Sequence, residues 1–555
     1  MTDPSLVSII AATTAVFIYL VITLRNVGRR PADYPPGPPT LPIIGNLHLM
    51  PSKYPHQQFK KWAEEYGPIY SLVLGTKTYI VLSSDVAVKD LLDKRGANYS
   101  SRPEIFIGHE IASGGLRLVT MPYGPLWRMM HKIIHGILNI RAAKAYVPYQ
   151  MLERQQMLLG FLEQPNEFVK HLRRYSFSLT TQIIYGFRAQ SIHHPKLQQL
   201  ITCFESWGEV VGNASAQILD LFPVLRKLPK FLLPSYRYAQ ELHRVERKLY
   251  TDLWMDAKRE ILAGTAKPNF CVDLLKAQEV EQFSDAQAGY ISGSLLEAGS
   301  DTTASMLSAF VLAMVVSPDV QAKGQEEIDR VVGPARLPTM DDAPDMPYIR
   351  ACVKETLRWM PTVILGTPHC AIQEDSYMGY RIPAGSTIIT NVWALQMDSN
   401  RHPNPRAFDP ARFVNDTLSE FEAAMDPDVS KRGNFVFGTG RRLCQGMHIA
   451  ERSMFLAISG LLWAFTFEKT LGADGKPVTP DIDDLVGGIA VQPAPFGAVI
   501  EPRGTDKAEI IRKGWRECEE LLDRETYQWK EVPGGMAFGK NKVGSGLPIS
   551  WGTGR

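Results

Sequence analysis

A short loop with one cysteine, FGTGRRLCQG from Phe437 to Gly446, constrains this 555-residue chain more than any other feature. Its three glycines permit backbone angles and close approaches that other residues do not tolerate. A helix is expected to begin near Gln445, so that its positive N-terminus faces the Cys444 sulfur and favours the thiolate. The loop is therefore suited to present an anionic sulfur to a flat metal-bearing group. The alternative is a buried structural cysteine on a glycine-rich loop.

The other cysteines do not indicate a second metal site or a disulfide framework. The chain has six cysteines, none in a CxxC pair and none with zinc-ligand spacing. Scattered cysteines in so long a chain favour a reducing compartment for the main domain. A hydrophobic content of 45% and a charged content of 21% are ordinary for a globular protein. The net charge of +2 is too balanced for a nucleic-acid-binding protein.

The N-terminal residues have the composition of a membrane anchor. The uncharged segment from Ser5 to Leu24 would span a bilayer core of about 30 Å as a helix rising about 1.5 Å per residue. Arg25, Arg29 and Arg30 follow it, which places residues 1–4 in the lumen and the chain that follows the anchor in the cytosol. A cleaved signal peptide is the alternative, but no basic region precedes the segment and no A-x-A site follows.

The remainder divides into a linker, one large domain and a C-terminal extension. Residues 25–46 are basic and then proline-rich, which favours a stiff linker. Residues 47–503 show no composition shift, and the predicted fold class is mainly α with small β-sheets. Residues 504–555 are expected to form a one-faced helix over 506–524 and a disordered tail from Gly534. The expected long helices of the domain cover 127–138, 175–185, 239–262, 284–316, 320–332, 349–359 and 447–465, and short strands are expected near 377–389 and 489–500.

The cysteine loop resembles that of the cytochrome P-450 family, which reads FxxGxRxCxG. The fixed positions are met by Phe437, Gly440, Arg442, Cys444 and Gly446. The resemblance extends from about Pro35 to Arg503. It implies the cytochrome P-450 fold, a haem b whose iron is ligated by the Cys444 thiolate, and a monooxygenase that inserts one atom of O2 into its substrate. In the family's pattern Phe437 shields the sulfur and Arg442 pairs with a haem propionate.

The sequence EAGSDTT, Glu297 to Thr303, lies inside the expected helix over 284–316. Alone it would predict only a locally weak helix. By resemblance, this stretch crosses the oxygen-binding face of the haem. Asp301 and Thr302 match the acid–alcohol pair that relays protons to bound oxygen, which is general acid catalysis.

The sequence ETLR, Glu355 to Arg358, is followed by FDPARF, which contains Arg412. An ExxR string is more often a solvated salt bridge between residues three apart. Here the resemblance implies a structural ion network of Glu355, Arg358 and Arg412 behind the cysteine loop. Ala411 stands where the family usually has glutamate, but the arginine is the member that pairs. The expected role of the network is folding and haem retention.

Three further residues match propionate-binding positions of the family. Trp127 matches a family tryptophan, while His131 stands where the family usually has arginine, so this contact rests on His131 or on Arg128 or Lys132. His369 falls where the family often has a propionate ligand. For both histidines the alternative is an ordinary residue with local hydrogen bonds.

The segment PAPFGAVIEPR, which ends at Arg503, resembles the closing strand of filamentous-fungal members. With the anchor it implies a fungal enzyme of secondary metabolism in the endoplasmic reticulum membrane, its catalytic domain facing the cytosol. Such enzymes take electrons from NADPH through NADPH–cytochrome reductase. A basic patch is expected to dock that acidic partner, the alternative being a solvated charged face. The expected patch residues are Arg128, Lys132, Lys431, Arg432 and Arg441.

The expected substrate pocket is mostly apolar, which indicates a bulky lipophilic substrate such as a terpenoid, polyketide or indole alkaloid. A haem-thiolate isomerase or dehydratase that does not use O2 is the main alternative. Such members tend to lack the distal threonine, whereas this chain keeps Thr302. A haem sensor or binding protein without turnover is a further alternative, but both motifs are complete here. By resemblance, the pocket walls are 106–111, 204–211, Leu295, Ala298, 362–367 and Phe496.

Overall fold

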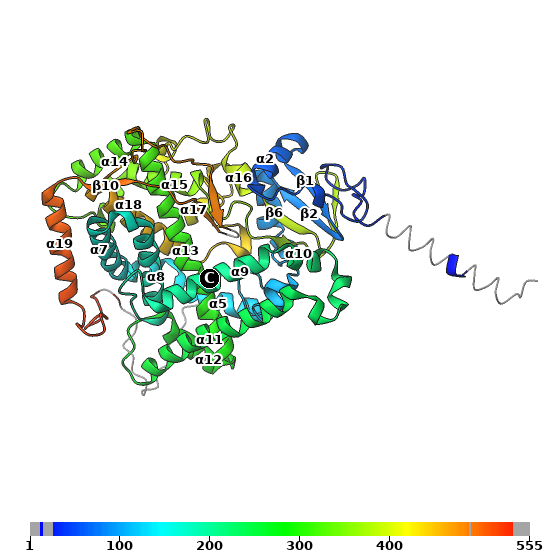
Figure 1. Ribbon diagram of the computed structural model, residues 1–555, viewed down its shortest axis with the longest axis horizontal. Helices are drawn as coiled ribbons and strands as arrows, with labels where there is room; N and C mark the ends of the chain where they lie inside the picture. The colour runs from blue at the N-terminus through cyan, green and yellow to red at the C-terminus, as the bar shows by residue number, and fades with distance from the viewer. Residues whose placement is uncertain (1–11, 15–25, 488–489, 535, 537–555) are drawn as a thin grey trace, which may run out of the picture.

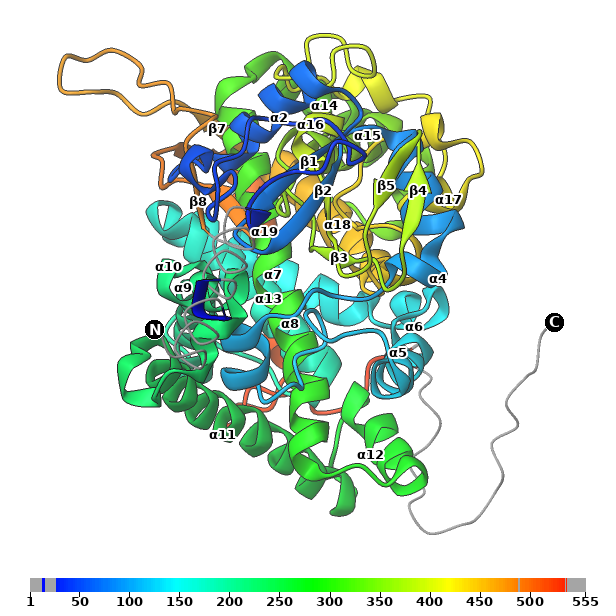
Figure 2. The ribbon, with the colours of Figure 1, turned by 90° about the vertical axis from the view of Figure 1, so that its right-hand side faces the viewer.

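The computed structural model describes residues 12–14, 26–487, 490–534 and 536, and most of them are helical. The long helix α13 (Asp285–Val316) runs through the middle of the molecule (Figures 1 and 2). Helices α8 (Phe168–Tyr185) and α18 (Met447–Ala464) pack against it. The prediction of a mainly helical domain with small sheets is confirmed. Of the expected anchor, only residues 12–14 are among those described, and they are helical.

Helix α13 begins where its sequence predicts. The Ser284 hydroxyl accepts a hydrogen bond from the Gln287 backbone N–H, and the Ser284 backbone N–H donates to the Gln287 side-chain oxygen, forming a capping box. Among the described residues, α13 alone is long and apolar enough to cross a membrane. However, 72% of its most apolar window is buried inside the protein, which identifies α13 as a core helix.

The other expected helices are present but often begin earlier, and further helices lie between them. Six of the helices listed next begin at a proline, because a proline in the first turn needs no backbone N–H donor. The helices are α2 (Pro55–Tyr66), α5 (Pro125–Leu138), α7 (Val147–Glu163), α9 (Pro195–Gly212), α10 (Ala214–Leu221), α11 (Pro234–Leu262), α12 (Phe270–Glu281), α14 (Pro318–Val331) and α15 (Pro347–Trp359). Shorter ones are α3 (Asp85–Val88), α4 (Gly96–Tyr99), α6 (Ile140–Ala145), α16 (Val392–Gln396), α17 (Glu420–Met425), and the single turns η3 (Phe106–Ile111) and η8 (Pro410–Phe413).

The strands form one four-stranded sheet and three pairs at the periphery. The larger sheet has the order β1 (Ile69–Leu74), β2 (Lys77–Leu82), β6 (Thr387–Thr390), β3 (His369–Cys370). Only β2 and β6 are parallel, with Tyr79 opposite Thr387. The pairs are β4 (Asp375–Tyr377) with β5 (Tyr380–Ile382), β8 (Leu485–Gly487) with β9 (Val491–Pro493), and β7 (Phe465–Glu468) with β10 (Val499–Pro502).

The proline-rich linker lies along β1. The Ser71 backbone N–H donates to the Pro36 carbonyl at 2.7 Å, and the Ser71 hydroxyl donates to the Pro35 carbonyl at 2.6 Å. Asn46 ends the segment, where its side chain accepts from the Val73 N–H at 2.9 Å and donates to the Pro38 carbonyl at 3.1 Å. These bonds fix the linker on the domain.

Two separate hydrophobic clusters matter for the site. The main core surrounds α13 and includes α7, α8, α15, α18 and the second half of α11. A smaller cluster joins η3, α9, α10 and the first half of α11, through residues such as Ile107, Trp207, Leu219 and Leu242. We call this second group the roof cluster.

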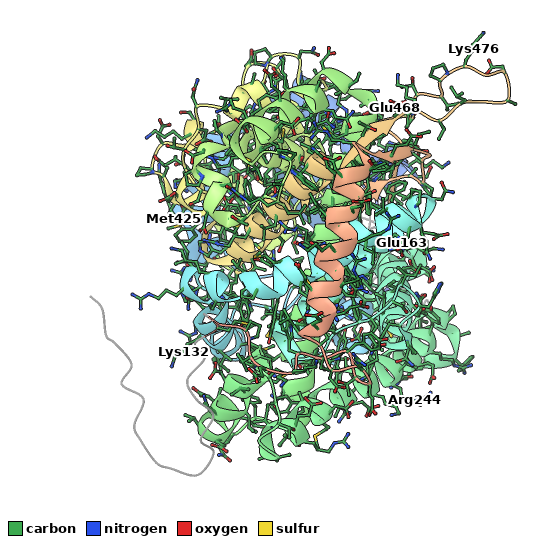
Figure 3. All side chains as sticks on the ribbon, turned by 90° about the vertical axis from the view of Figure 1, so that its left-hand side faces the viewer. Lys132, Glu163, Arg244, Met425, Glu468 and Lys476 are labelled. Atoms are coloured by element: carbon green, nitrogen blue, oxygen red, sulfur yellow. The ribbon has the colours of Figure 1, made fainter. Side chains whose placement is uncertain are left out.

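The C-terminal extension continues the folded structure. Helix α19 (Thr505–Glu520) packs against α7 and runs along the face shown in Figure 3. Beyond it, the buried Trp529 indole donates to the Gln182 side chain at 2.9 Å. The tail expected to be disordered lies outside the described residues, apart from Gly534 and Met536.

Candidate active site

The cysteine loop has a tightly constrained backbone. The Cys444 N–H donates to the Phe437 carbonyl at 2.8 Å and closes the loop. Gly438 and Gly440 have φ of +75° and +63°, in the left-handed region that favours glycine. A side chain at Gly440 would also collide with the Leu92 carbonyl oxygen. The glycines of this motif are therefore required by the loop geometry.

The Cys444 sulfur receives backbone hydrogen bonds. Burial raises the pKa of the Cys444 thiol, and the N–H groups of Gly446 and Met447 oppose this rise. These donors stabilise the thiolate form, as expected for the start of α18. The Cys444 side chain is nevertheless accessible, although protein surrounds the loop.

Arg432 corrects one sequence-based expectation. It was expected on the surface patch, but it is buried and holds the cysteine loop. Its guanidinium donates to the Asn434 carbonyl and to the Thr439 hydroxyl, both at 3.0 Å, and also to the Gly438 carbonyl. The glycine turns leave these acceptors without partners in a helix or strand, so a nearby arginine satisfies them.

Near its middle, helix α13 exposes a stripe of side chains, and Gly299, Asp301 and Thr303 beside it are also partly accessible. Leu295, Ala298 and Thr302 are accessible, and their spacing of three and four residues places them on one face. The Thr302 hydroxyl donates to the Ala298 carbonyl at 2.7 Å. The Ser176 hydroxyl of α8 donates to the Gly299 carbonyl at 2.7 Å. Side-chain bonds to these carbonyls compete with the helical ones and locally weaken the helix.

Asp301 lies beside Thr302 on this helix. Burial raises the pKa of the Asp301 carboxyl, and the positive charge of Arg173 on α8 partly opposes the rise. A carboxyl with a raised pKa holds a proton more readily near neutral pH. The predicted acid–alcohol pair is therefore placed at one edge of the accessible stripe.

The predicted ion network is assembled behind the cysteine loop. Arg358 donates from Nε and Nη2 to the two Glu355 oxygens at 2.6 and 2.7 Å, and both side chains are 0% exposed. Arg412 Nε, on η8, lies 3.4 Å from Glu355 Oε1. The Asp409 N–H also donates to Glu355 at 2.8 Å. The three sequence-predicted residues are thus brought together.

Gln396 connects this network to the cysteine loop. The Arg358 guanidinium donates to the Gln396 carbonyl at 3.0 Å, and the Gln396 side chain donates to the Arg358 carbonyl at 2.6 Å. The same side chain accepts from the Phe435 N–H at 3.4 Å. Phe435 lies two residues before the loop, so loss of the network is expected to disturb the loop that holds Cys444.

Two guanidinium groups matter here: Arg442, which is half-buried in the loop itself, and Arg102, which is buried near it. Arg442 lies 4.1 Å over the Trp127 ring and donates to the Ser100 and Met121 carbonyls, both at 2.8 Å. Arg102 donates to the Val119 carbonyl at 2.9 Å and to the Thr367 carbonyl at 2.8 Å. Burial, and then the charge of Arg442, lowers the pKa of Arg102. Neither arginine has a carboxylate partner among the residues described.

The two predicted histidines lie beside these arginines. His369 is buried and donates from Nδ1 to the Tyr99 carbonyl at 2.8 Å. Burial lowers the pKa of His369, and the charge of Arg102 lowers it further. The His131 ring lies 4.5 Å from the Trp127 ring, and burial, then the neighbouring His135, lowers its pKa. Both histidines are therefore neutral hydrogen-bonding groups near neutral pH.

These residues fit the haem that the resemblance predicts. An accessible cysteine with N–H donors to its sulfur suits an iron-bound thiolate, and α13, which carries the accessible stripe, packs against α18, the helix that begins three residues after Cys444. Unpaired buried guanidinium groups are costly, and the carboxylates of a haem would compensate Arg102 and Arg442. Arg102 was missed because it lies in an irregular segment with no motif around it.

The expected pocket walls are only partly brought together. Segments 106–111 and 204–211 meet in the roof cluster. Phe496 does not join them, because it packs against Phe168, the first residue of α8, about two helical turns before the Ser176 contact with α13. The β8–β9 hairpin meets segment 362–367 instead, where the Thr362 hydroxyl donates to the Val491 carbonyl at 3.1 Å.

Comparisons with known proteins show the family of the chain. The family model "Cytochrome P-450" matches residues 35–497. The chain is 52% identical to cytochrome P-450 monooxygenase virE of Hypocrea virens, over 93% of each chain. It is 49% identical to monooxygenase fogE of Aspergillus ruber over 95% of this chain and 98% of the relative. It is also 49% identical to monooxygenase fsoB of Humicola fuscoatra over 94% of this chain and 96% of that relative.

The matched region includes both the cysteine loop and the ion network. The family model ends before α19. The alignment with the relative fogE covers 95% of this chain and therefore extends beyond the family model. The family model covers most of the chain, and the relatives are about half identical over nearly their whole length. The chain belongs to the cytochrome P-450 family.

Proposed function

We propose that this chain is a haem-dependent monooxygenase that inserts one atom of O2 into a bulky lipophilic substrate of fungal secondary metabolism. The placement of Asp301 and Thr302 on the accessible stripe of α13 is the observation that carries this proposal. A haem-thiolate isomerase or dehydratase would not need a proton relay there. Electrons come from NADPH through a reductase. When bound, the haem supplies the activation of O2.

The chain's own residues have separate tasks in this proposal. Cys444 ligates the iron, with the Gly446 and Met447 N–H groups holding its negative charge. Trp127, Arg442, Arg102, His131 and His369 would hold the propionates. Thr302 holds a proton at its hydroxyl, and Asp301 resupplies it, because its raised pKa keeps the carboxyl protonated more often.

The residues of the accessible stripe and of the roof cluster favour a lipophilic substrate. Leu295 and Ala298 are the accessible apolar members of the α13 stripe. The Thr302 hydroxyl donates a hydrogen bond to the Ala298 carbonyl of the same helix. The roof cluster adds an apolar surface from η3 and α9. A substrate bound here is positioned mainly by apolar contacts, so a bulky apolar skeleton should bind most favourably.

The reductase is proposed to dock near the start of α5. Arg128, Lys132 and Arg441 are exposed, and Lys132 is labelled at the surface in Figure 3. The Arg441 side chain donates to the Tyr123 hydroxyl at 3.2 Å, which places it beside that helix. Positive charges at this position would steer an acidic partner toward the cysteine-loop side. The buried Arg432 does not contribute, and Lys431 pairs with Asp426 at 3.2 Å.

The endoplasmic reticulum membrane is the proposed location, with residues 5–24 as the single-pass anchor. The connection between α10 and α11 supports a membrane contact, because Val224 and Phe231 are 68% and 66% exposed. Removing residues 1–25 should move most of the protein from the membrane fraction to the soluble fraction under high-salt washing. Full retention of the shortened protein would contradict the anchor.

The function is tested with NADPH, reductase, isotopically labelled O2 and a panel of lipophilic polyketides and terpenoids. The product should carry one labelled oxygen atom and require NADPH. Thr302→Ala should keep haem but lower product formed per NADPH by roughly 10²-fold, because the relay supplies general acid catalysis. Thr303→Ala, the neighbouring substitution, is the control and should remain coupled. A product formed without NADPH and without label would favour the isomerase or dehydratase.

A further inference from the structure

A buried ionic cluster joins three distant parts of the chain. Arg117, from the segment between η3 and α5, donates to Glu246 of α11 and to Glu297 of α13. Its Nε also donates to the Ser113 hydroxyl at 2.9 Å. These three charged residues are 1%, 0% and 7% exposed. None of them belongs to the thiolate site, the propionate group or the proton relay described above.

The cluster lies at the joint between the roof cluster and the main core. Along α11, Leu242 belongs to the roof cluster and Tyr250 to the main core, with Glu246 between them. The Arg117 guanidinium lies 4.0 Å over the ring of Trp207, a roof residue. Glu297 is the first residue of EAGSDTT, and the next residue, Ala298, lies on the accessible stripe. Arg117 therefore ties the roof to the oxygen-side helix.

The charges in this cluster do not balance. One guanidinium faces two carboxylates, and burial raises the pKa of Glu246 while Arg117 opposes the rise. The other groups around the carboxylates are uncharged near neutral pH. They are the Tyr250 hydroxyl, which donates to Glu297, the Cys203 thiol of α9, and Tyr290, which bonds His243 at 2.8 Å. Without Arg117, two buried carboxylates would face each other with no cation among these contacts, which is strongly unfavourable.

We propose that Arg117, Glu246 and Glu297 form a latch that sets how often the roof cluster separates from α13. Arg117 is its positioning residue. With the latch closed, the roof limits exchange of water and small molecules with the accessible face around Ala298 and Thr302. The role of that face rests on the proposed function, whereas the contacts of the latch do not.

The test is amide hydrogen exchange of the haem-loaded protein over residues 106–120. Arg117→Met should speed exchange there on the order of 100-fold, because the bridge between α11 and α13 is lost and local opening becomes easier. Arg117→Lys keeps the charge but reaches one carboxylate, so exchange should rise on the order of 10-fold. Carbon monoxide should also rebind faster after flash photolysis, most in Arg117→Met and less in Arg117→Lys.

Arg188→Met is the matched control. Arg188 is also a buried guanidinium and bonds Glu153 at 2.7 Å, but its contacts lie on α7 and on the C-terminal extension. It should leave exchange over 106–120 unchanged. Unchanged exchange in Arg117→Lys would overturn the latch, whether or not the methionine variant assembles. The haem-thiolate spectrum is recorded first, and a chain without that spectrum refutes the proposed function. The same exchange comparison is then made on the protein as purified, because the latch contacts involve protein atoms only.

Discussion

Replacing Glu355 by alanine is expected to abolish the haem-loaded protein. The substitution leaves the Arg358 guanidinium without its partner at 0% exposure. Breaking a buried ion pair from one side costs about 3–5 kcal/mol, a large part of the roughly 5–15 kcal/mol that stabilises a typical domain. The Gln396 bond to Phe435 carries the disturbance to the cysteine loop. Haem absorbance per mole of purified protein measures the loss.

An exposed pair with the same spacing gives the control. Asp273 and Lys276 are also three residues apart on a helix, with 2.9 Å between them, but their side chains are 44% and 54% exposed. Exposed pairs contribute less than about 1 kcal/mol, so Asp273→Ala should bind haem fully. A Glu355→Ala protein with a normal haem content would show that the network is dispensable.

Much of the fold was predictable because it depends on local pattern. The apolar run and the Ser284 cap predict α13 almost to the residue. The glycines around Cys444 predict a constrained loop, and the positive φ at Gly438 and Gly440 gives the reason. Helix starts were placed too late where a proline opens the helix, as at Pro234, because the apolar periodicity begins only after it.

The remaining parts depend on contacts between distant segments. Arg102 and Arg117 lie in irregular connections, where no periodicity reveals that a charged side chain is buried. Arg432 resembles any surface arginine until the carbonyls of the cysteine loop surround it. Phe496 was assigned to the pocket from its place along the chain, but the β8–β9 hairpin turns back before it. In each case the tertiary neighbours decide the role.

Replacing Cys444 by serine is expected to remove the thiolate signature while keeping most of the haem cradle. Arg102, Arg442 and Trp127 do not touch the substituted atom through any hydrogen bond of the structure. A serine hydroxyl stays protonated near neutral pH and does not donate charge to iron as a thiolate does. Cys518→Ser, on α19, is the control and should keep the thiolate signature, since that cysteine lies outside the site.

The reduced carbon-monoxide difference spectrum of the purified protein tests the central claim most directly. We expect a strongly red-shifted Soret band in the unmodified protein and in Cys518→Ser, and no such band in Cys444→Ser. A protein without haem, or a band at the position typical of histidine ligation, would contradict the assignment of Cys444 as the iron ligand.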